Sequence, residues 1–128
     1  MSNPKPSLSP NQKLGYLGEQ LAKKHLLNKG YQFIQQNFRS KFGEIDLIFQ
    51  DKETLVFVEV KTRVGDEYGP PEDAITPFKI RHLIKAAQYF QLKNPSLSES
   101  CRIDIIAVQF DEISHKLQSI NHYENITL

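Results

Sequence analysis

The sequence predicts a small α/β domain with a mixed β-sheet, and three observations lead to that prediction. Apolar residues recur at helical spacing over residues 10–29 and again over residues 77–93. Short segments rich in Val, Ile and Phe, which are typical of strands, lie at residues 31–36, 44–50, 55–61 and 103–110, with a weaker one at 119–123. The resulting order is helix, three strands, helix and strand, which is an order found in small α/β domains.

Local signals mark both ends of the first helix. Ser9 can act as its N-cap with Gln12 as the return partner of a capping box, and Gly30 can end it in a left-handed conformation. Gly15 and Gly18 lie inside this helix, where each costs roughly 1 kcal/mol relative to Ala. The simplest explanation of both glycines is close packing of the helix on a sheet.

Turn-forming residues separate the remaining elements. Residues 37–42 are interpreted as a polar connection and residues 51–54 as a hairpin turn. Residues 65–71 hold two glycines and two prolines and form either a lid or a simple mobile link. Thr76 then caps the second helix, with Pro77 in its first turn.

Length and composition exclude several classes of protein. The 128 residues suit a single domain at residues 10–128, preceded by a flexible polar tail at residues 1–9. The net charge of +1 indicates neither a nucleic-acid nor a membrane partner by itself. One cysteine excludes an internal disulfide and a cysteine-built zinc site. Without an apolar run of about 20 residues or a secretory signal, we expect a cytoplasmic protein with no membrane partner.

Charged residues interrupt the third predicted strand at its end. Alternation places Glu59 and Lys61 on one face of this strand, opposite an ordinary valine face. If the turn at 51–54 holds an even number of residues, Asp46 on the preceding strand lies directly opposite Glu59, and Glu44 lies opposite Lys61. The sequence thus predicts two carboxylates and an ammonium group close together on one surface.

Two carboxylates at that spacing repel each other by roughly 3–4 kcal/mol at an effective dielectric constant near 20. Water, a shared proton or a cation can relieve the repulsion, and Mg²⁺ is suited to one or two carboxylates plus water and phosphate. Lys61 could then orient a water molecule or stabilise charge on a phosphate, which together indicates metal-dependent phosphodiester hydrolysis. The competing interpretation is a set of ordinary cross-strand partners in water.

Two motifs carry a resemblance to a known family. They are Gly43-Glu44-Ile45-Asp46-Leu47-Ile48 and Phe57-Val58-Glu59-Val60-Lys61-Thr62-Arg63, and Gly18-Glu19 of the first helix matches as well. With them the chain resembles the YraN family of uncharacterised bacterial proteins from residue 14 to residue 108. That family is similar to the PD-(D/E)XK nucleases and to archaeal Holliday-junction resolvases, which implies a restriction-endonuclease-like core.

The resemblance also implies site residues. Asp46 and Glu59 would be ligands of Mg²⁺ or Mn²⁺, with the Val60 carbonyl as a further ligand. Lys61 would be the catalytic lysine, and Glu19 would reach the site from the first helix as an added acid. The sequence places Ile45 where the family pattern has a proline, and it leaves the roles of Glu44, Gln88 and Asp104 open.

Basic residues in the loops and the second helix flank the predicted site and could contact phosphates without reading sequence. They are Arg39, Lys41, Arg63, Lys79 and Lys85. The alternative is a solvated surface, and the four histidines are expected at the surface too.

The function predicted is metal-dependent cleavage of nucleic acid, DNA before RNA and branched DNA in particular. The alternative is a nucleic-acid-binding module of the same fold that does not cleave. A nuclease that cuts both strands would suit a homodimer.

Overall fold

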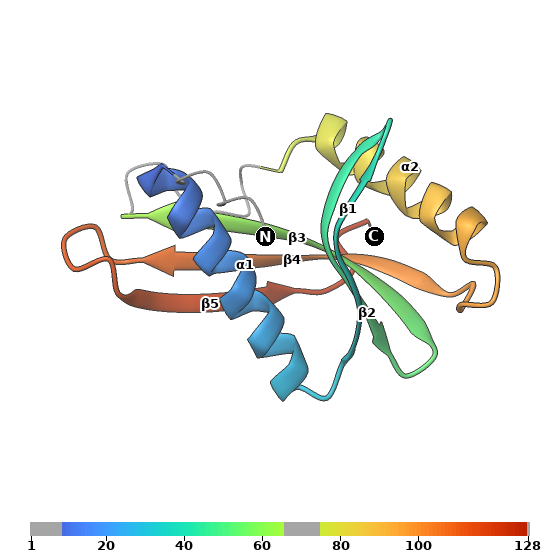
Figure 1. Ribbon diagram of the computed structural model, residues 1–128, viewed down its shortest axis with the longest axis horizontal. Coiled ribbons are helices and arrows are strands. Elements are labelled where there is room, and N and C mark those ends of the chain that lie inside the picture. Colours follow the sequence, from blue (N-terminus) through green and yellow to red (C-terminus); the bar gives the residue numbers. More distant parts are fainter. Residues whose placement is uncertain (1–8, 66–74, 128) are drawn as a thin grey trace, which may run out of the picture.

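A five-stranded mixed sheet with a helix on each face forms the protein in this computed structural model, which describes residues 9–65 and 75–127 (Figure 1). The elements in chain order are α1 (Pro10–Asn28), β1 (Gln32–Ser40), β2 (Gly43–Asp51), β3 (Thr54–Val64), α2 (Pro77–Lys93), β4 (Cys101–Phe110) and β5 (Leu117–Tyr123). The predicted α/β class and element order are confirmed, and β5 corresponds to the weaker predicted strand.

The strands follow one another in space as they do in sequence, in the order β1-β2-β3-β4-β5. All neighbouring pairs are antiparallel except β3 and β4, which are parallel and are connected through α2. A parallel pair needs such a crossover because its second strand must begin at the same edge of the sheet as the first. In Figure 1 the β1–β2 hairpin twists away from the plane of the other strands toward α2.

Both helices begin where their local signals predict, and α1 also ends as predicted. The Ser9 hydroxyl accepts the Gln12 N–H at 3.2 Å and the Gln12 side chain accepts the Ser9 N–H at 2.9 Å, which completes the capping box. Gly30 follows α1 with a φ of 92°. The Thr76 hydroxyl accepts the Lys79 N–H at 3.1 Å at the start of α2.

The alternation of side chains along β2 and β3 divides the core into two clusters. On the α1 side, Ala22 and Leu26 pack with the buried strand residues Leu47, Phe49, Val56, Val58, Ile106 and Val108. On the α2 side, Leu83, Ala87 and Phe90 pack with Ile48, Leu55, Phe57 and Ile103. The predicted valine face is therefore the one that α1 covers.

β1 is longer than the sequence predicted. Residues 37–42 were expected to form a polar connection, but β1 continues to Ser40 and ends just before the turn into β2. The Phe38 ring packs against Phe90 of α2 with ring centroids 5.1 Å apart, which holds this stretch on the sheet. Its polar neighbours misled the interpretation because β1 is an edge strand, so alternate side chains face water.

The lid or link predicted at residues 65–71 lies mostly outside the described residues, as does nearly all of the predicted tail at residues 1–9. α1 and α2, the helices of the described ranges, are both too short or too polar to cross a membrane.

Candidate active site

The site forms where β2 and β3 separate. Their ladder runs from Asp51 and Thr54 to Leu47 and Val58 in the predicted register, and among the described residues it ends one pair before Asp46 would face Glu59. β3 continues to Val64 with β4 alone as its partner. The two-residue turn at residues 52–53 fixes this register, so the predicted even loop is confirmed.

Asp46 connects β2 and β3 at the point where the two strands separate, beyond Leu47 and Val58, which we call the fork. Its Oδ2 accepts the backbone N–H of Val60 at 2.8 Å, a contact that a β2 carbonyl would make if the ladder continued. The carboxylate therefore satisfies a strand N–H that the separation leaves without a backbone partner on that side. This bond fixes the Asp46 side chain next to Glu59, which precedes Val60 on β3.

Glu59 is a buried carboxylate with one satisfied oxygen and one unsatisfied oxygen. The residue is only 5% exposed. Its Oε1 lies 3.7 Å from the Lys61 ammonium and 3.6 Å from the Lys79 ammonium. Its Oε2 is buried and has no hydrogen-bond partner, a condition that normally costs about 1–3 kcal/mol or more for a charged group.

The carboxylates at the fork perturb one another. Burial raises the pKa of Asp46 to about 8; the Glu59 charge adds to the rise, and the Val60 N–H opposes it. Burial also raises the pKa of Glu59, against the two neighbouring ammonium groups that lower it. The pKa of Glu19 is raised by burial and by the charges of Glu44 and Glu59. The structure thus brings together all the acidic residues that the sequence associated with the site.

Gly18 explains how Glu19 of α1 reaches a site built on strands. A Cβ atom at position 18 would overlap the Thr62 hydroxyl of β3, so only glycine lets α1 lie this close to β3. The predicted close packing is therefore confirmed for Gly18. The same explanation is wrong for Gly15, because its position opens onto free space: nothing lies within 4 Å of a Cβ built there.

The donor atoms at the fork suit a hard divalent cation with few protein ligands. No group of three or more His, Cys, Asp or Glu side chains in the described ranges is arranged to hold a metal. Mg²⁺ needs fewer, since it commonly takes one or two carboxylates and fills its other positions with water and phosphate. The unsatisfied Oε2 of Glu59 beside Asp46 fits that description, and the Val60 carbonyl belongs to the residue whose N–H already holds Asp46.

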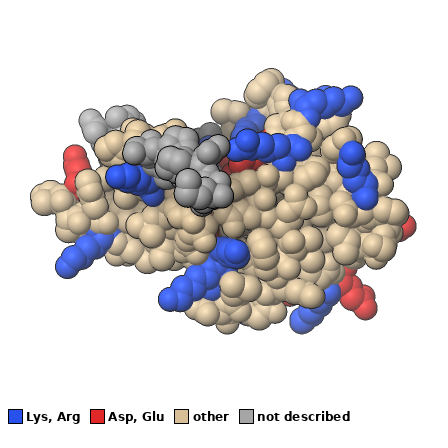
Figure 2. All heavy atoms as spheres, in the orientation of Figure 1, with Lys and Arg blue, Asp and Glu red and all other residues tan. Residues whose placement is uncertain are grey.

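Four of the five predicted phosphate-binding residues occupy three different environments. Lys79 pairs with Glu59, so it belongs to the site itself. Arg39 is largely exposed and lies 3.5 Å from Glu44. Lys41 and Lys85 line a hollow of about 410 Å³ between the β1–β2 turn and α2. Figure 2 shows Lys and Arg side chains spread over the visible face of the molecule instead of forming one continuous patch.

Arg63 differs from the other basic residues. It is half-buried near the end of β3, and its Nε is buried without a hydrogen-bond partner. Glu59 Oε2 and Arg63 Nε are the two atoms in this condition within the described part of the chain.

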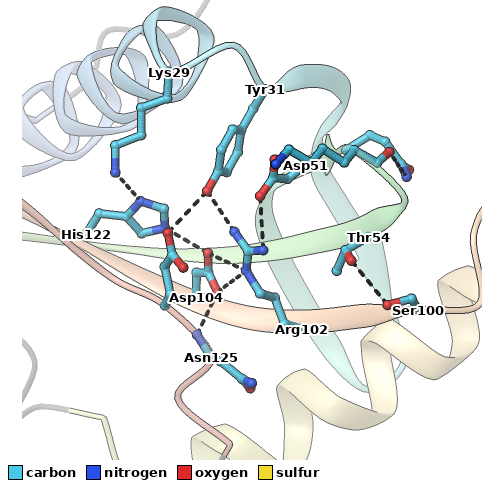
Figure 3. Close-up of polar contacts among 12 residues, drawn as sticks. Lys29, Tyr31, Asp51, Thr54, Ser100, Arg102, Asp104, His122 and Asn125 are labelled. Atoms are coloured by element: carbon cyan, nitrogen blue, oxygen red, sulfur yellow. Dashed lines mark hydrogen bonds and ion pairs between the residues drawn. The ribbon is translucent and has the colours of Figure 1, made fainter.

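A second polar cluster was missed by the sequence interpretation (Figure 3). Asp104 is fully buried and accepts hydrogen bonds from Arg102 Nε at 3.1 Å, His122 Nε2 at 2.7 Å and the Asn125 N–H at 2.9 Å. The His122 ring then accepts at Nδ1 from the Lys29 ammonium, 2.8 Å away. The expectation of a surface histidine is wrong for His122, whose side chain is only 3% exposed.

One signal could have revealed this cluster. Arg102 and Asp104 lie two residues apart on a strand that otherwise consists of apolar residues, so they share a face and need partners there. Arg102 also donates to Tyr31 at 2.7 Å and to Asp51 at 3.2 Å. The role of Asp104, which the sequence left open, is therefore to hold this second cluster together.

Comparison with known proteins places the chain in a family. The model of the uncharacterised protein family UPF0102 matches residues 18–108. A UPF0102 protein of Geobacter metallireducens is 42% identical over 115 residues, which cover 90% of this chain and 92% of the relative. One from Vibrio parahaemolyticus is 43% identical over 102 residues, covering 79% of this chain and 84% of the relative. The chain therefore belongs to the UPF0102 family, which is the YraN family that its strand motifs resemble.

Proposed function

We propose that this protein is a metal-dependent nuclease that hydrolyses phosphodiester bonds of nucleic acid. The observation that carries the proposal is the buried, unsatisfied Oε2 of Glu59 next to the Asp46 carboxylate. Burying two carboxylates together is unfavourable unless something positive or a proton joins them. A divalent cation bound by both residues would remove the repulsion between the carboxylates and would give Glu59 Oε2 a partner.

Each residue at the fork has a role in the proposed reaction. Asp46, Glu59 and the Val60 carbonyl would hold Mg²⁺ or Mn²⁺. The bound cation would supply Lewis-acid polarisation of the phosphate and a more acidic water. Lys61, whose ammonium lies 3.7 Å from Glu59, would orient a water molecule or stabilise negative charge on the phosphate. Glu19 adds a further acid from α1.

The basic residues around the fork support a polyanionic substrate. Lys79 pairs with Glu59 at the fork and Arg39 pairs with Glu44, whereas Lys41 and Lys85 line the hollow between the β1–β2 turn and α2. Arg63 lies further along β3. Contacts from such side chains to phosphates would position a strand without reading its sequence. DNA, and branched DNA in particular, is the substrate that we propose to test first.

A non-cleaving nucleic-acid-binding module is the second candidate, and one observation favours it. Lys61 and Lys79 already place two ammonium groups on Glu59. Two such charges can balance a carboxylate pair without a metal ion. The two candidates differ in metal binding and in turnover, so they can be separated.

The test combines metal titration with cleavage of a substrate panel. Branched, flapped, single-stranded and duplex DNAs, together with RNA, are incubated with Mg²⁺ or Mn²⁺. We expect cleavage by the wild type and a loss of at least about 100-fold in rate for Asp46→Asn, Glu59→Gln and Lys61→Ala, the scale on which removal of one catalytic electrostatic group acts.

Asp51→Asn makes a matched control for this test, because it changes an aspartate at the opposite end of β2. Its rate should equal that of the wild type. Equal activity in wild type and Lys61→Ala would indicate a contaminating nuclease. Salt-sensitive DNA binding with neither metal uptake nor cleavage would support the non-cleaving module instead.

A further inference from the structure

Two unsatisfied buried atoms of opposite charge type lie on one strand. Within the described residues, Glu59 Oε2 and Arg63 Nε are the buried side-chain atoms without a hydrogen-bond partner. Glu59 belongs to a carboxylate and therefore calls for a cation or a donor. Arg63 belongs to a guanidinium group, which can only donate and therefore calls for an acceptor.

Both side chains point to the same face of β3. Residues 59, 61 and 63 alternate with Thr62, whose hydroxyl faces Gly18 of α1 on the other side of the sheet. Leu55 and Phe57, earlier on the same face, are covered by α2. The face that α2 covers at the start of β3 thus continues as a row of Glu59, Lys61 and Arg63 toward the end of the strand.

The spacing separates the two unsatisfied atoms into two subsites. Four residues of a β-strand span about 13 Å. One strand of duplex DNA rises about 3.4 Å per phosphate. A phosphate at Arg63 would therefore be a different one from the phosphate at Glu59, about two to four nucleotides away once side-chain reach is included.

The guanidinium group itself indicates what the second subsite binds. No described carboxylate forms an ion pair with Arg63, whereas Arg39 pairs with one carboxylate and Arg102 with two. Arginine is suited to phosphate because its planar donors match two phosphate oxygens at once. Within the described residues, β2 does not pair with β3 beyond Val58, so along this row the edge of β3 that faces away from β4 has no strand partner.

We propose that Arg63 binds a backbone phosphate two to four nucleotides from the bond that is cut, so that the substrate is a polynucleotide strand lying along the second half of β3. This inference rests on the proposed function for the position of the cut. It deepens that function because it excludes mononucleotides and dinucleotides as the preferred substrate: they would leave the Arg63 subsite empty.

The experiment is a double-mutant cycle between protein and nucleic acid. In a DNA strand chosen as the best-bound member of the panel, single phosphates are replaced one at a time by uncharged methylphosphonates. Binding is measured by fluorescence anisotropy with Ca²⁺ and with EDTA, so that the readout needs no turnover. For the wild type we expect one replacement, two to four nucleotides from the cut, to weaken binding about tenfold, the scale of a lost charged hydrogen bond.

Arg63→Gln should weaken binding of the unmodified strand by the same factor and should make that one replacement silent. Arg63→Lys should restore part of the affinity, since it keeps the charge but loses the planar pair of donors. Lys52→Gln removes one charge from the exposed turn at the opposite end of β3 and should leave the whole pattern unchanged. Thermal unfolding of each variant establishes that it is folded, and Arg63→Gln should not lower Tm because its Nε makes no hydrogen bond to lose.

Two outcomes would overturn the inference: an Arg63→Gln protein that binds the unmodified strand as tightly as the wild type, or one that keeps the same replacement pattern. Either result would leave the proposed nuclease intact if the wild type cleaves. Conversely, the expected cycle in a protein that never cleaves would support the phosphate subsite and reject the hydrolytic function.

Discussion

The two polar clusters on the sheet differ in how completely their buried charges are satisfied. Around Asp104 on the α1 side, the carboxylate accepts from Arg102, His122 and the Asn125 N–H. At the fork between β2 and β3, Asp46 accepts one N–H and Glu59 keeps one buried oxygen without a partner. Both clusters bury carboxylates, but only the first surrounds its carboxylate with donors.

The difference agrees with a structural role for the Asp104 cluster and with the functional role that we propose for the fork. Removing one member of a buried, fully hydrogen-bonded charge network lowers stability, because the remaining charges are left buried without a partner and without solvation by water. Buried acids that repel each other do the opposite: they destabilise the fold until a ligand or proton arrives, and such groups are concentrated at functional sites. Substitutions in the two clusters should therefore change stability in opposite directions.

The largest expected effect is the loss of the Asp104 network. We expect Asp104→Asn to reduce the free energy of unfolding by about 3–5 kcal/mol, the usual result of removing one partner from a buried charged pair. Urea unfolding at neutral pH measures it. Asp51→Asn is the matched control: Asp51 also pairs with Arg102, but its side chain is 29% exposed, so we expect a loss of about 1 kcal/mol or less. Equal losses in both variants would contradict the comparison.

The second largest expected effect is a gain in stability on substitution of Asp46. Asn at position 46 can still accept the Val60 N–H but carries no charge, so Asp46→Asn should stabilise the metal-free protein by about 1–3 kcal/mol above neutral pH. The folded-state pKa of Asp46 is raised to about 8. Its favourable contribution as a protonated acid is complete below its ordinary pKa and is lost as pH rises through about 8.

The stability gap between Asp46→Asn and wild type should therefore open between about pH 4 and pH 8 and stay constant above that range. Unfolding in EDTA across this range measures the gap. Saturating Mn²⁺ should reverse it, because only the wild type gains the full binding energy of the cation. A variant that is less stable than wild type at every pH would show that Asp46 is a structural residue.

A smaller effect concerns acid conditions. Burial alone would raise the pKa of Asp104, but hydrogen bonds from His122, the Asn125 N–H and Arg102 outweigh it and hold the pKa below its ordinary value. A depressed pKa contributes stability that is present above the ordinary value and is lost as pH falls through the folded-state value. The gap between wild type and Asp104→Asn should thus narrow below about pH 4, the reverse of the Asp46 profile. If the difference in free energy of unfolding between wild type and Asp104→Asn stayed constant below about pH 4, Asp104 would act only through packing.

Local sequence signals predicted much of this architecture. The caps at Ser9 and Thr76 marked where the helices begin, and the even turn at residues 52–53 set the register that brings Asp46 near Glu59. These features depend on residues close together in the chain, so spacing arguments reach them.

Contacts between residues far apart in the sequence could not be predicted from spacing in the same way. Lys29 and His122 are 93 residues apart, and Arg102 and Tyr31 are 71 apart. The separation of β2 from β3 at Asp46 accompanies the twist of the β1–β2 hairpin away from the other strands (Figure 1), which involves residues throughout the sheet. Lys79 reaches Glu59 because α2 packs on the face of β3 that carries Leu55, Phe57 and Glu59. No spacing rule predicts that packing.

The smallest expected effect tests the role of Lys79 at the fork. Its side chain is 40% exposed, so Lys79→Gln should change the free energy of unfolding by less than about 1 kcal/mol. At the proposed metal site, however, the ammonium would compete with a divalent cation for the Glu59 carboxylate. Lys79→Gln should therefore bind Mn²⁺ a few-fold more tightly in calorimetric titration, whereas Lys93→Gln at the other end of α2 should leave the affinity unchanged. Weaker Mn²⁺ binding by Lys79→Gln would reverse this assignment: Lys79 would then hold Glu59 in position for the cation instead of competing with it.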